Sequence, residues 1–138
     1  MNSIILMGRL TKDPEIRYSQ SAEPVCVARY TLAVNRKFKR DGEPEADFIN
    51  CVSFGKTGEF IERYIKRGMQ IAARGVLKVN TYDDEQGKRK WITVVVVEEV
   101  QFAESKAAYE TRMAKSGGIK KEDIPEGFTE ITDADVAF

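Results

Sequence analysis

Alternation of apolar and polar residues in five separate segments restricts how this chain can fold more than any other feature. Side chains of an extended strand point alternately to its two faces, so each alternating segment predicts a strand with one buried face. A turn and a short extended stretch, residues 16–18, follow the first segment. The five expected strands cover residues 3–10, 25–35, 47–54, 69–82 and 91–102.

A single helix is expected to interrupt the strands, between residues 55 and 68. Thr57 is the expected N-cap, and Gly68 is expected to follow the last turn. The helical stripe consists of Phe60, Ile61, Tyr64 and Ile65. Three strands, a helix and two further strands are the order of elements in an OB-fold. The predicted fold is therefore all-β, a five-stranded OB-fold barrel with one helix between strands 3 and 4, followed by a flexible acidic C-terminal tail.

Two of the expected strands carry residues that bear on function. One face of the 69–82 strand is predicted to meet the core, and it consists of Met69, Ile71, Ala73, Leu77 and Val79. The opposite face of that strand carries Arg74, Lys78, Asn80 and Tyr82. In the 47–54 strand, Phe48 and Phe54 share one face with Asn50 and Val52, while Ile49, Cys51 and Ser53 take the other.

The charges are distributed unevenly along a chain of 138 residues whose net charge is zero. Residues 105–138 carry 5 Lys/Arg against 7 Asp/Glu, and the last 17 residues carry six acids and no base. A marginal helix is expected over 105–115, and the acidic remainder lacks any alternation. The chain is therefore expected to contain one folded domain, residues 1–104, and a linker with an acidic tail, residues 105–138, that is disordered when unbound.

Several classes of protein are excluded by residue usage. No run of about 18 apolar residues exists, and the N-terminus has no basic residue before its short apolar stretch, so neither a membrane span nor a signal peptide is expected. Cys26 and Cys51 lie in apolar runs and are expected to be buried free thiols, although a disulfide between them stays open. Because the chain has no histidine, no Cys/His metal site is expected. No cofactor is expected either.

One segment suggests an enzyme that acts on nucleotides. Phe54-Gly55-Lys56-Thr57 follows a strand and precedes the helix, as the end of a phosphate-binding P-loop does. That motif requires a glycine five residues before Gly55, and Asn50 occupies the position. The simpler interpretation is that Gly55 ends a strand, Thr57 caps a helix and Lys56 is solvated. No catalytic residue is therefore expected.

Cations and aromatic residues alternate in a way that suits non-specific binding of unpaired nucleic acid. Basic residues attract phosphates, and aromatic faces stack on bases of any sequence. In the segment 36–45, Phe38 lies among Arg36, Lys37, Lys39 and Arg40, and Asp41-Gly42 is a hairpin-turn signal, so a projecting ribbon or flexible loop is expected. A structural explanation stays open for each feature: strand phenylalanines are often core residues, and charged loops are usually only solvated.

Six motifs together give the chain a likeness to a known family. They are Leu6-Met7-Gly8-Arg9-Leu10, Asp13-Pro14-Glu15-Ile16-Arg17-Tyr18, Thr31-Leu32-Ala33, Phe54-Gly55-Lys56, Tyr64-Ile65-Lys66-Arg67-Gly68, and Gly75 with Leu77. In this order, over about residues 1–103, the sequence closely resembles the bacterial single-stranded DNA-binding protein family. Each motif is weak alone, and the set is specific.

The resemblance implies roles for particular residues. The family's base-stacking aromatics fall on Phe38, Phe48, Phe54 and Tyr82, where the first, second and fourth are commonly tryptophan in the family. The phosphate-binding residues that we select are Arg36, Lys37, Lys39, Arg40, Lys56, Arg74 and Lys78. Family members usually form homotetramers whose first strands help to pair subunits.

The resemblance also implies that the tail docks onto replication, recombination and repair proteins. The family's tail ends in acids, an aliphatic residue, a proline and a terminal phenylalanine. The matching residues are Asp133, Asp135, Val136 and Phe138, while Ala137 replaces the proline.

The expected function is sequence-tolerant binding and protection of single-stranded DNA in replication, recombination and repair, in the cytoplasm and associated with the nucleoid. An alternative is an OB-fold interaction module with weakened DNA binding. The missing tryptophans and the net charge of zero motivate this alternative.

Overall fold

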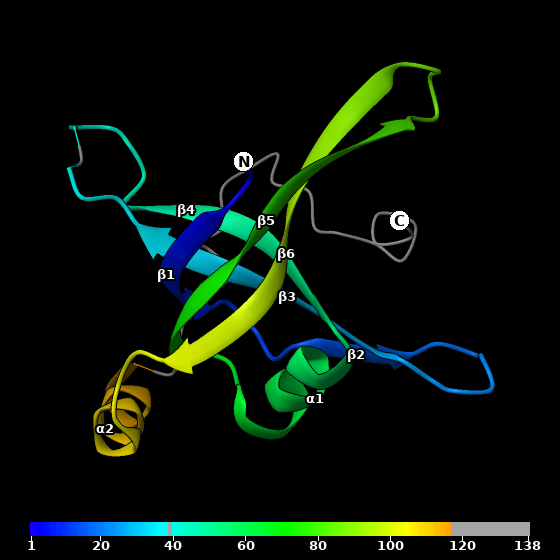
Figure 1. Cartoon of the computed structure of the whole chain (residues 1–138). Helices are drawn as coiled ribbons and strands as arrows, with labels where there is room; N and C mark the ends of the chain where they lie inside the picture. Colours follow the sequence, from blue (N-terminus) through cyan, green and yellow to red (C-terminus); the bar gives the residue numbers. More distant parts are fainter. Residues whose placement is uncertain (39, 117–138) are drawn as a thin grey trace.

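The computed structural model describes residues 1–38 and 40–116, which form one sheet and two helices (Figure 1). All five expected strands are present, and residues 16–18 belong to a separate short strand. The sheet therefore has six strands, and the first helix lies between β4 and β5. In chain order the elements are β1 Ile4–Leu10, β2 Glu15–Tyr18, β3 Cys26–Asn35, β4 Ala46–Phe54, α1 Gly55–Tyr64, β5 Gln70–Asp83, β6 Arg89–Phe102 and α2 Lys106–Ser116.

The strand pairings form a closed circuit. The order in the sheet is β1-β5-β6-β4-β3-β2, and β1 also pairs with β3. Pairing therefore runs from β1 through β5, β6, β4 and β3 back to β1, and β2 pairs with residues 26–29 of β3, on the edge that β1 occupies further along. The β4–β6 pairing is parallel, at Cys51↔Val95, and the others are antiparallel. Such closure leaves fewer strand edges unpaired.

The core fills the inside of this circuit with the inward-facing residues of each strand. Tyr30 contributes the only phenol among the buried core residues described, and its hydroxyl lies 2.7 Å from the Ser53 Oγ. Burial raises the pKa of that hydroxyl, so it stays protonated. Cys26 and Cys51 are both buried and free, which confirms the expectation of free thiols. The other large core residues include Leu10, Leu32, Ile61, Ile65, Ile71 and Val97.

Helix α1 differs from its expected bounds at both ends. Phe54 is the N-cap residue, and Gly55 is the first helical residue, so the expected N-cap at Thr57 is wrong. The Thr57 hydroxyl donates instead to the carbonyl oxygen of Glu98, at 3.1 Å, and so attaches the helix to β6. The helix ends at Tyr64, because Ile65 is extended and buried. Gly68, with φ of +82°, lies in the turn that leads to β5 rather than at the helix end.

The β5–β6 ribbon explains why two residues expected in the core are not buried. Ile71 and Ala73 are buried as expected, but Leu77 and Val79 are 39% and 57% exposed. The pairing of β5 with β1 ends at Gly75, and the pairing of β6 with β4 ends at Val95, which lies opposite Leu77. Past these residues the two strands extend away from the body of the sheet as a projecting ribbon (Figure 1). Leu77 lies opposite Val95 at the edge of the core, and Val79 lies opposite Thr93 further along the ribbon. Both side chains are therefore partly exposed, and the expectation that they pack in the core is wrong.

A β-bulge interrupts the β5–β6 pairing beside the end of the β1–β5 pairing. Arg74 is paired with Glu99, but the next residue, Gly75, is paired with Val97, so Glu98 has no residue opposite it. A side chain at position 75 has no room, because a Cβ built there would lie 1.9 Å from the carbonyl oxygen of Val96. Glycine at this position allows the close approach of the two backbones.

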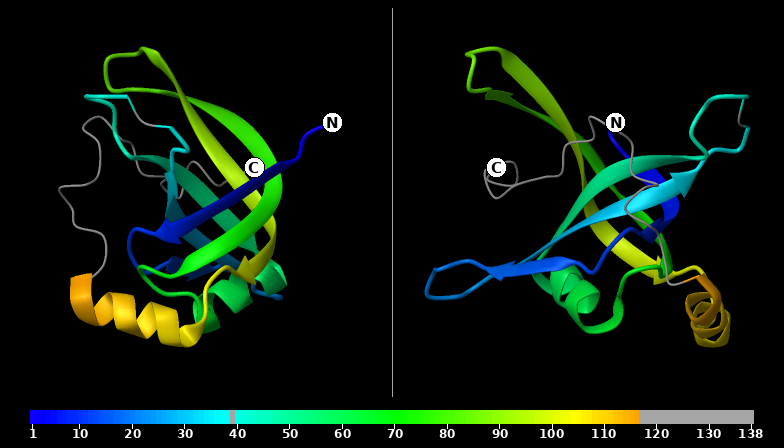
Figure 2. Two further views of the ribbon diagram at one scale, coloured as in Figure 1. Left: turned by 90° about the vertical axis from the view of Figure 1, so that its left-hand side faces the viewer. Right: turned by 180° about the vertical axis from the view of Figure 1, so that it is seen from behind.

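Helix α2 lies near the range expected for a marginal helix and contacts the folded domain. The Tyr109 hydroxyl donates to the carbonyl oxygen of Arg67, at 3.1 Å. The Arg112 guanidinium donates to Glu104 and to the carbonyl oxygen of Gly68. Both helices lie at one end of the sheet, while the β3–β4 loop and the β5–β6 ribbon project from the other (Figure 2). Neither of these helices has the length and apolar character that a membrane crossing requires.

Candidate nucleic-acid interface

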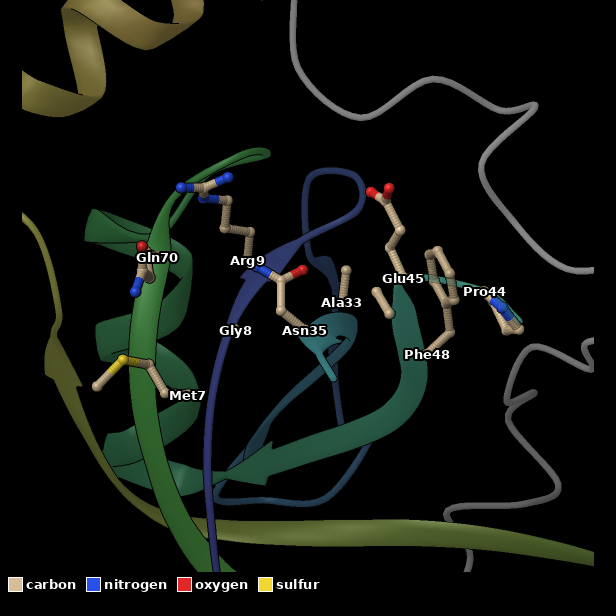
Figure 3. Close-up of a pocket in the computed structure, with 10 residues that line it drawn as sticks. Met7, Gly8, Arg9, Ala33, Asn35, Pro44, Glu45, Phe48 and Gln70 are labelled. Carbon is tan, nitrogen blue, oxygen red and sulfur yellow. The ribbon is translucent and has the colours of Figure 1, made fainter. Parts of the chain in front are cut away.

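Four residues from four strands form one row across the sheet. Arg9 of β1 lies opposite Gln70 of β5 on one side and opposite Ala33 of β3 on the other. Ala33 in turn lies opposite Phe48 of β4. Residues directly opposite each other on neighbouring strands place their side chains on the same face. We call this set, Gln70, Arg9, Ala33 and Phe48, the Phe48 row, and Figure 3 shows its members in that order.

The Phe48 row lies on the outer face of the sheet. Its neighbours in sequence, Leu10, Leu32 and Ile71, are fully buried in the core. Successive residues of a strand point to opposite faces, so the row points outward. Phe48 is accordingly half-buried rather than part of the core.

A pocket of about 610 Å³ lies over the Phe48 row. Ala33 has a short side chain, so the space between Arg9 and Phe48 is open (Figure 3). Gly8 allows β1 to lie close to β3, because a Cβ there would come within 2.6 Å of the Ala33 carbonyl oxygen. The remaining wall, which includes the foot of the β3–β4 loop, is formed by Met7, Asn35, Pro44, Glu45 and Ala46.

Phe54 lies on the same face of β4 as Phe48, but the two do not share the pocket. It is half-buried and opposite Val27. Six residues of strand separate the two phenylalanines, which corresponds to roughly 20 Å. Asn50 and Val52, between them on that face, are buried. Phe48 and Phe54 are therefore two separate aromatic positions along one strand.

The β3–β4 loop presents a third aromatic residue. Phe38 is 82% exposed, and the Lys37 Nζ lies 5.6 Å from the centre of its ring. Arg40 is exposed in the same loop. Gly42, with φ of +86°, forms the turn that the sequence indicates. Lys39 lies outside the described residues.

Arg36, one of the expected phosphate-binding cations, is paired with two acids. The Arg36 Nη2 lies 2.8 Å from the Asp47 Oδ1, and its Nη1 lies 3.3 Å from the Glu43 Oε2. Hydrogen bonding to Arg36 holds the pKa of the Asp47 carboxyl below its usual value. Because these acids balance the charge of Arg36, it is a weaker candidate for holding a phosphate.

Arg74 is paired in the same way on the outer face of the sheet. Its Nε lies 3.0 Å from the Glu99 Oε2, and its Nη1 lies 3.5 Å from the Glu98 Oε2. These partners come from the bulged part of β6, which the sequence alone does not align with Arg74. The acids on β6 therefore reduce the positive charge of this part of the surface.

The remaining expected site residues lie on separate elements. Tyr82 is 39% exposed on the β5–β6 ribbon, on the same face of β5 as Lys78. Trp91, 66% exposed, lies on the ribbon's opposite face beside Thr81. Lys56 is exposed in the first turn of α1. The tail residues Asp133, Asp135, Val136 and Phe138 lie outside the described residues.

Sequence reasoning missed the polar residues that surround Phe48. Arg9, Asn35 and Gln70 all line its pocket. Arg9 belongs to one of the motifs that carried the family resemblance, but nothing in the local pattern connects it with Phe48. Strand register brings the two together, and register between distant strands is not visible in a local pattern.

These features define a class of protein: a mainly β domain with aromatic rings and cations on its outer face and on its projecting loops. The chain belongs to the single-strand binding protein family, whose model matches residues 1–103. Membership implies an OB-fold for this part of the chain, in agreement with the mainly β architecture and the helix between β4 and β5.

Named relatives agree with this assignment. The chain is 50% identical over 105 residues to "Single-stranded DNA-binding protein" of Clostridium perfringens, covering 76% of this chain and 67% of the relative. It is 48% identical over 107 residues to "Single-stranded DNA-binding protein 2" of Listeria monocytogenes, covering 77% and 66% of the two chains. It is 37% identical to "Single-stranded DNA-binding protein 3" of Clostridium acetobutylicum over the full length of both.

Proposed function

We propose that this chain binds single-stranded DNA without sequence preference and thereby protects it. The observation that carries the proposal is the position of Phe48, on the outer face, half-exposed, at the foot of the loop that presents Lys37 and Phe38. A base stacked on Phe48 has its backbone within reach of that loop. Stacking of this kind is tolerant of sequence because every base has a π-face.

The proposed binding surface lies on the outside of an OB-fold barrel. The closed circuit of β1, β5, β6, β4 and β3 supports the barrel, with β2 as an extension of β3. The bases stack on Phe38, Phe48, Phe54 and Tyr82, and the cations that attract phosphates are Lys37, Lys39, Arg40, Lys56 and Lys78. Arg36 and Arg74 contribute less, because their acidic partners must first be displaced. No step of this function requires catalysis or a cofactor.

Binding is expected to weaken steeply as salt rises. Each phosphate neutralised on a single strand contributes about −0.7 to the slope of log K against log[salt], so four contacts give roughly −3. The measurement is fluorescence anisotropy of a labelled oligo(dT) at several salt concentrations. An affinity that stays constant from low to high salt contradicts the proposed cationic surface.

The acidic partners of Arg36 and Arg74 favour one competing function, an OB-fold module that serves mainly in protein assembly. In that case the paired arginines mark a surface whose affinity for DNA has been reduced. A substitution of the stacking residues separates the two functions, because only a DNA-binding surface loses oligonucleotide affinity when they are removed.

The acidic tail is proposed to recruit proteins of replication, recombination and repair. Deleting residues 130–138 is expected to leave DNA affinity unchanged or to raise it slightly, because acids compete with phosphates for the cationic surface. The deleted and full-length chains are compared by oligo(dT) anisotropy at one salt concentration. A large loss of affinity on deletion contradicts a role confined to partner docking.

We also propose that the chain acts as a homotetramer in the cytoplasm, on DNA of the nucleoid. Exposed Ile5 on the outer face of β1 supports subunit pairing through the first strand. Light scattering of the intact chain measures the mass of the assembly directly.

A further inference from the structure

The Arg9 guanidinium is placed in an unusual way for a charged group. Its Nε is buried and has no hydrogen-bond partner among the described residues. Burying a charged donor without a partner costs free energy, so such a group usually marks a place where a ligand or water completes the hydrogen bonding. Arg9 lines the same pocket as Phe48, with only the short Ala33 between them in the row (Figure 3).

The pocket offers what one nucleotide of a single strand requires. Phe48 supplies an aromatic face at one end, and Arg9 supplies positive charge at the other. The side-chain amide of Asn35 lies between Arg9 and Phe48, and the side-chain amide of Gln70 lies on the other side of Arg9 (Figure 3). The acid of the pocket, Glu45, lies on the Phe48 side (Figure 3). A negatively charged phosphate is therefore favoured at the Arg9 end, and the base at the Phe48 end.

A carboxylate near Arg9 is already engaged by another cation. Glu104, which follows β6, accepts a hydrogen bond from the Gln70 backbone N–H at 3.0 Å and another from the Arg112 Nη2 at 2.9 Å. The hydrogen bond from Arg112 is the main reason that the pKa of Glu104 lies below its usual value, and the positive charge of Arg9 adds to it. Glu104 is thus ionised and close enough to compete for Arg9, but α2 supplies Arg112 to occupy it.

We propose that the pocket over the Phe48 row is a subsite for one nucleotide, in which Arg9 binds the phosphate and Arg112 keeps Glu104 from neutralising Arg9. This inference rests on the proposed function and goes beyond it, because it adds a phosphate-binding residue on β1 and gives α2 a positioning role. Arg9 touches the ligand, whereas Arg112 acts only through Glu104.

The first test replaces Arg9 by glutamine, which keeps a polar side chain and removes the charge. The variant is expected to bind oligo(dT) about tenfold more weakly, and the slope of log K against log[salt] is expected to fall in magnitude by about 0.7. Arg9→Lys restores the slope and part of the affinity. Arg63→Gln, the same change at an exposed position on α1 outside the pocket, is the matched control and leaves both quantities unchanged.

The second test examines the positioning role by rescue. Arg112→Ala is expected to weaken binding severalfold, because Glu104 then pairs with Arg9. Adding Glu104→Gln to that variant is expected to restore the affinity, since the competing carboxylate is gone. A loss caused only by damage to α2 is not rescued in this way, so failure of the rescue overturns the role of Arg112.

The possible outcomes distinguish a failure of the Arg9 subsite from a failure of the proposed DNA-binding function. If Arg9→Gln binds with unchanged affinity and slope while Phe48→Ala binds weakly, the chain binds single-stranded DNA and Arg9 is not part of the site. If the unaltered chain itself fails to bind oligo(dT), the proposed function and the subsite are both overturned. Thermal unfolding of each variant, followed by circular dichroism, checks that the fold is retained.

Discussion

Replacing both Phe48 and Phe54 by alanine is expected to weaken the binding of single-stranded DNA by about 30-fold to 10⁴-fold. Stacking of a base on an aromatic side chain is worth about 1–3 kcal/mol by alanine substitution, and two positions give roughly 2–6 kcal/mol. The two rings lie on the same face of β4 at separate positions, so their losses are expected to add. Anisotropy titration with one oligo(dT) at one salt concentration measures the effect.

The matched control for this variant is an aromatic residue away from the proposed surface. Tyr64 is exposed on α1 and packs against Phe60, with ring centres 5.1 Å apart. Tyr64→Ala is expected to lower stability modestly and to leave oligonucleotide affinity unchanged. If the double phenylalanine variant stays folded and binds as tightly as the unaltered chain, the stacking surface has been misplaced and the interaction-module function is favoured.

The largest expected effect on stability comes from Gly75→Ala. A Cβ at this position would lie 1.9 Å from the carbonyl oxygen of Val96 and 2.9 Å from the Cα of Val97, and both are backbone atoms that cannot move aside independently. The bulge between β5 and β6 must therefore open. We expect a loss of at least about 3 kcal/mol in the free energy of unfolding, and a fall in Tm of roughly 10 °C or more. Thermal unfolding followed by circular dichroism measures it.

Gly87→Ala provides the comparison that isolates the clash. Gly87 has a φ of +77°, and no atom lies within 4 Å of the place that a Cβ would take, so alanine there meets backbone strain alone. That strain costs about 1–2 kcal/mol. A Gly75→Ala variant that unfolds at a temperature equal to or above that of Gly87→Ala contradicts the close approach of β5 and β6 at the bulge.

The strands were predictable from the sequence because their signal is local. Each strand repeats every two residues, and a strand with one buried face carries that repeat in its own side chains. The same logic placed Ile71 and Ala73 in the core correctly. It failed for Leu77 and Val79, which keep the alternation but lie at the edge of the core and on the ribbon, where both side chains are partly exposed. Alternation predicts a shared face but not whether another element covers that face.

The details of the candidate site were not predictable for a related reason. The pairing of Arg36 with Asp47 and of Arg74 with Glu99 depends on which strand positions lie opposite each other. Arg9 and Phe48 are brought together through Ala33, across three strands. A bulge or a one-residue shift changes every such pair, and no local pattern fixes the register between distant strands.

The measurement that tests the central claim most directly is a titration of a 5′-labelled oligo(dT) of about 35 nucleotides, beside the matched duplex, read by fluorescence anisotropy. The account predicts tight, salt-sensitive binding to the single strand and far weaker binding to the duplex, because stacking on Phe48 and Phe54 requires unpaired bases. Equal binding to both, or negligible binding to either, would contradict it and would mean that the fold has been kept without the activity.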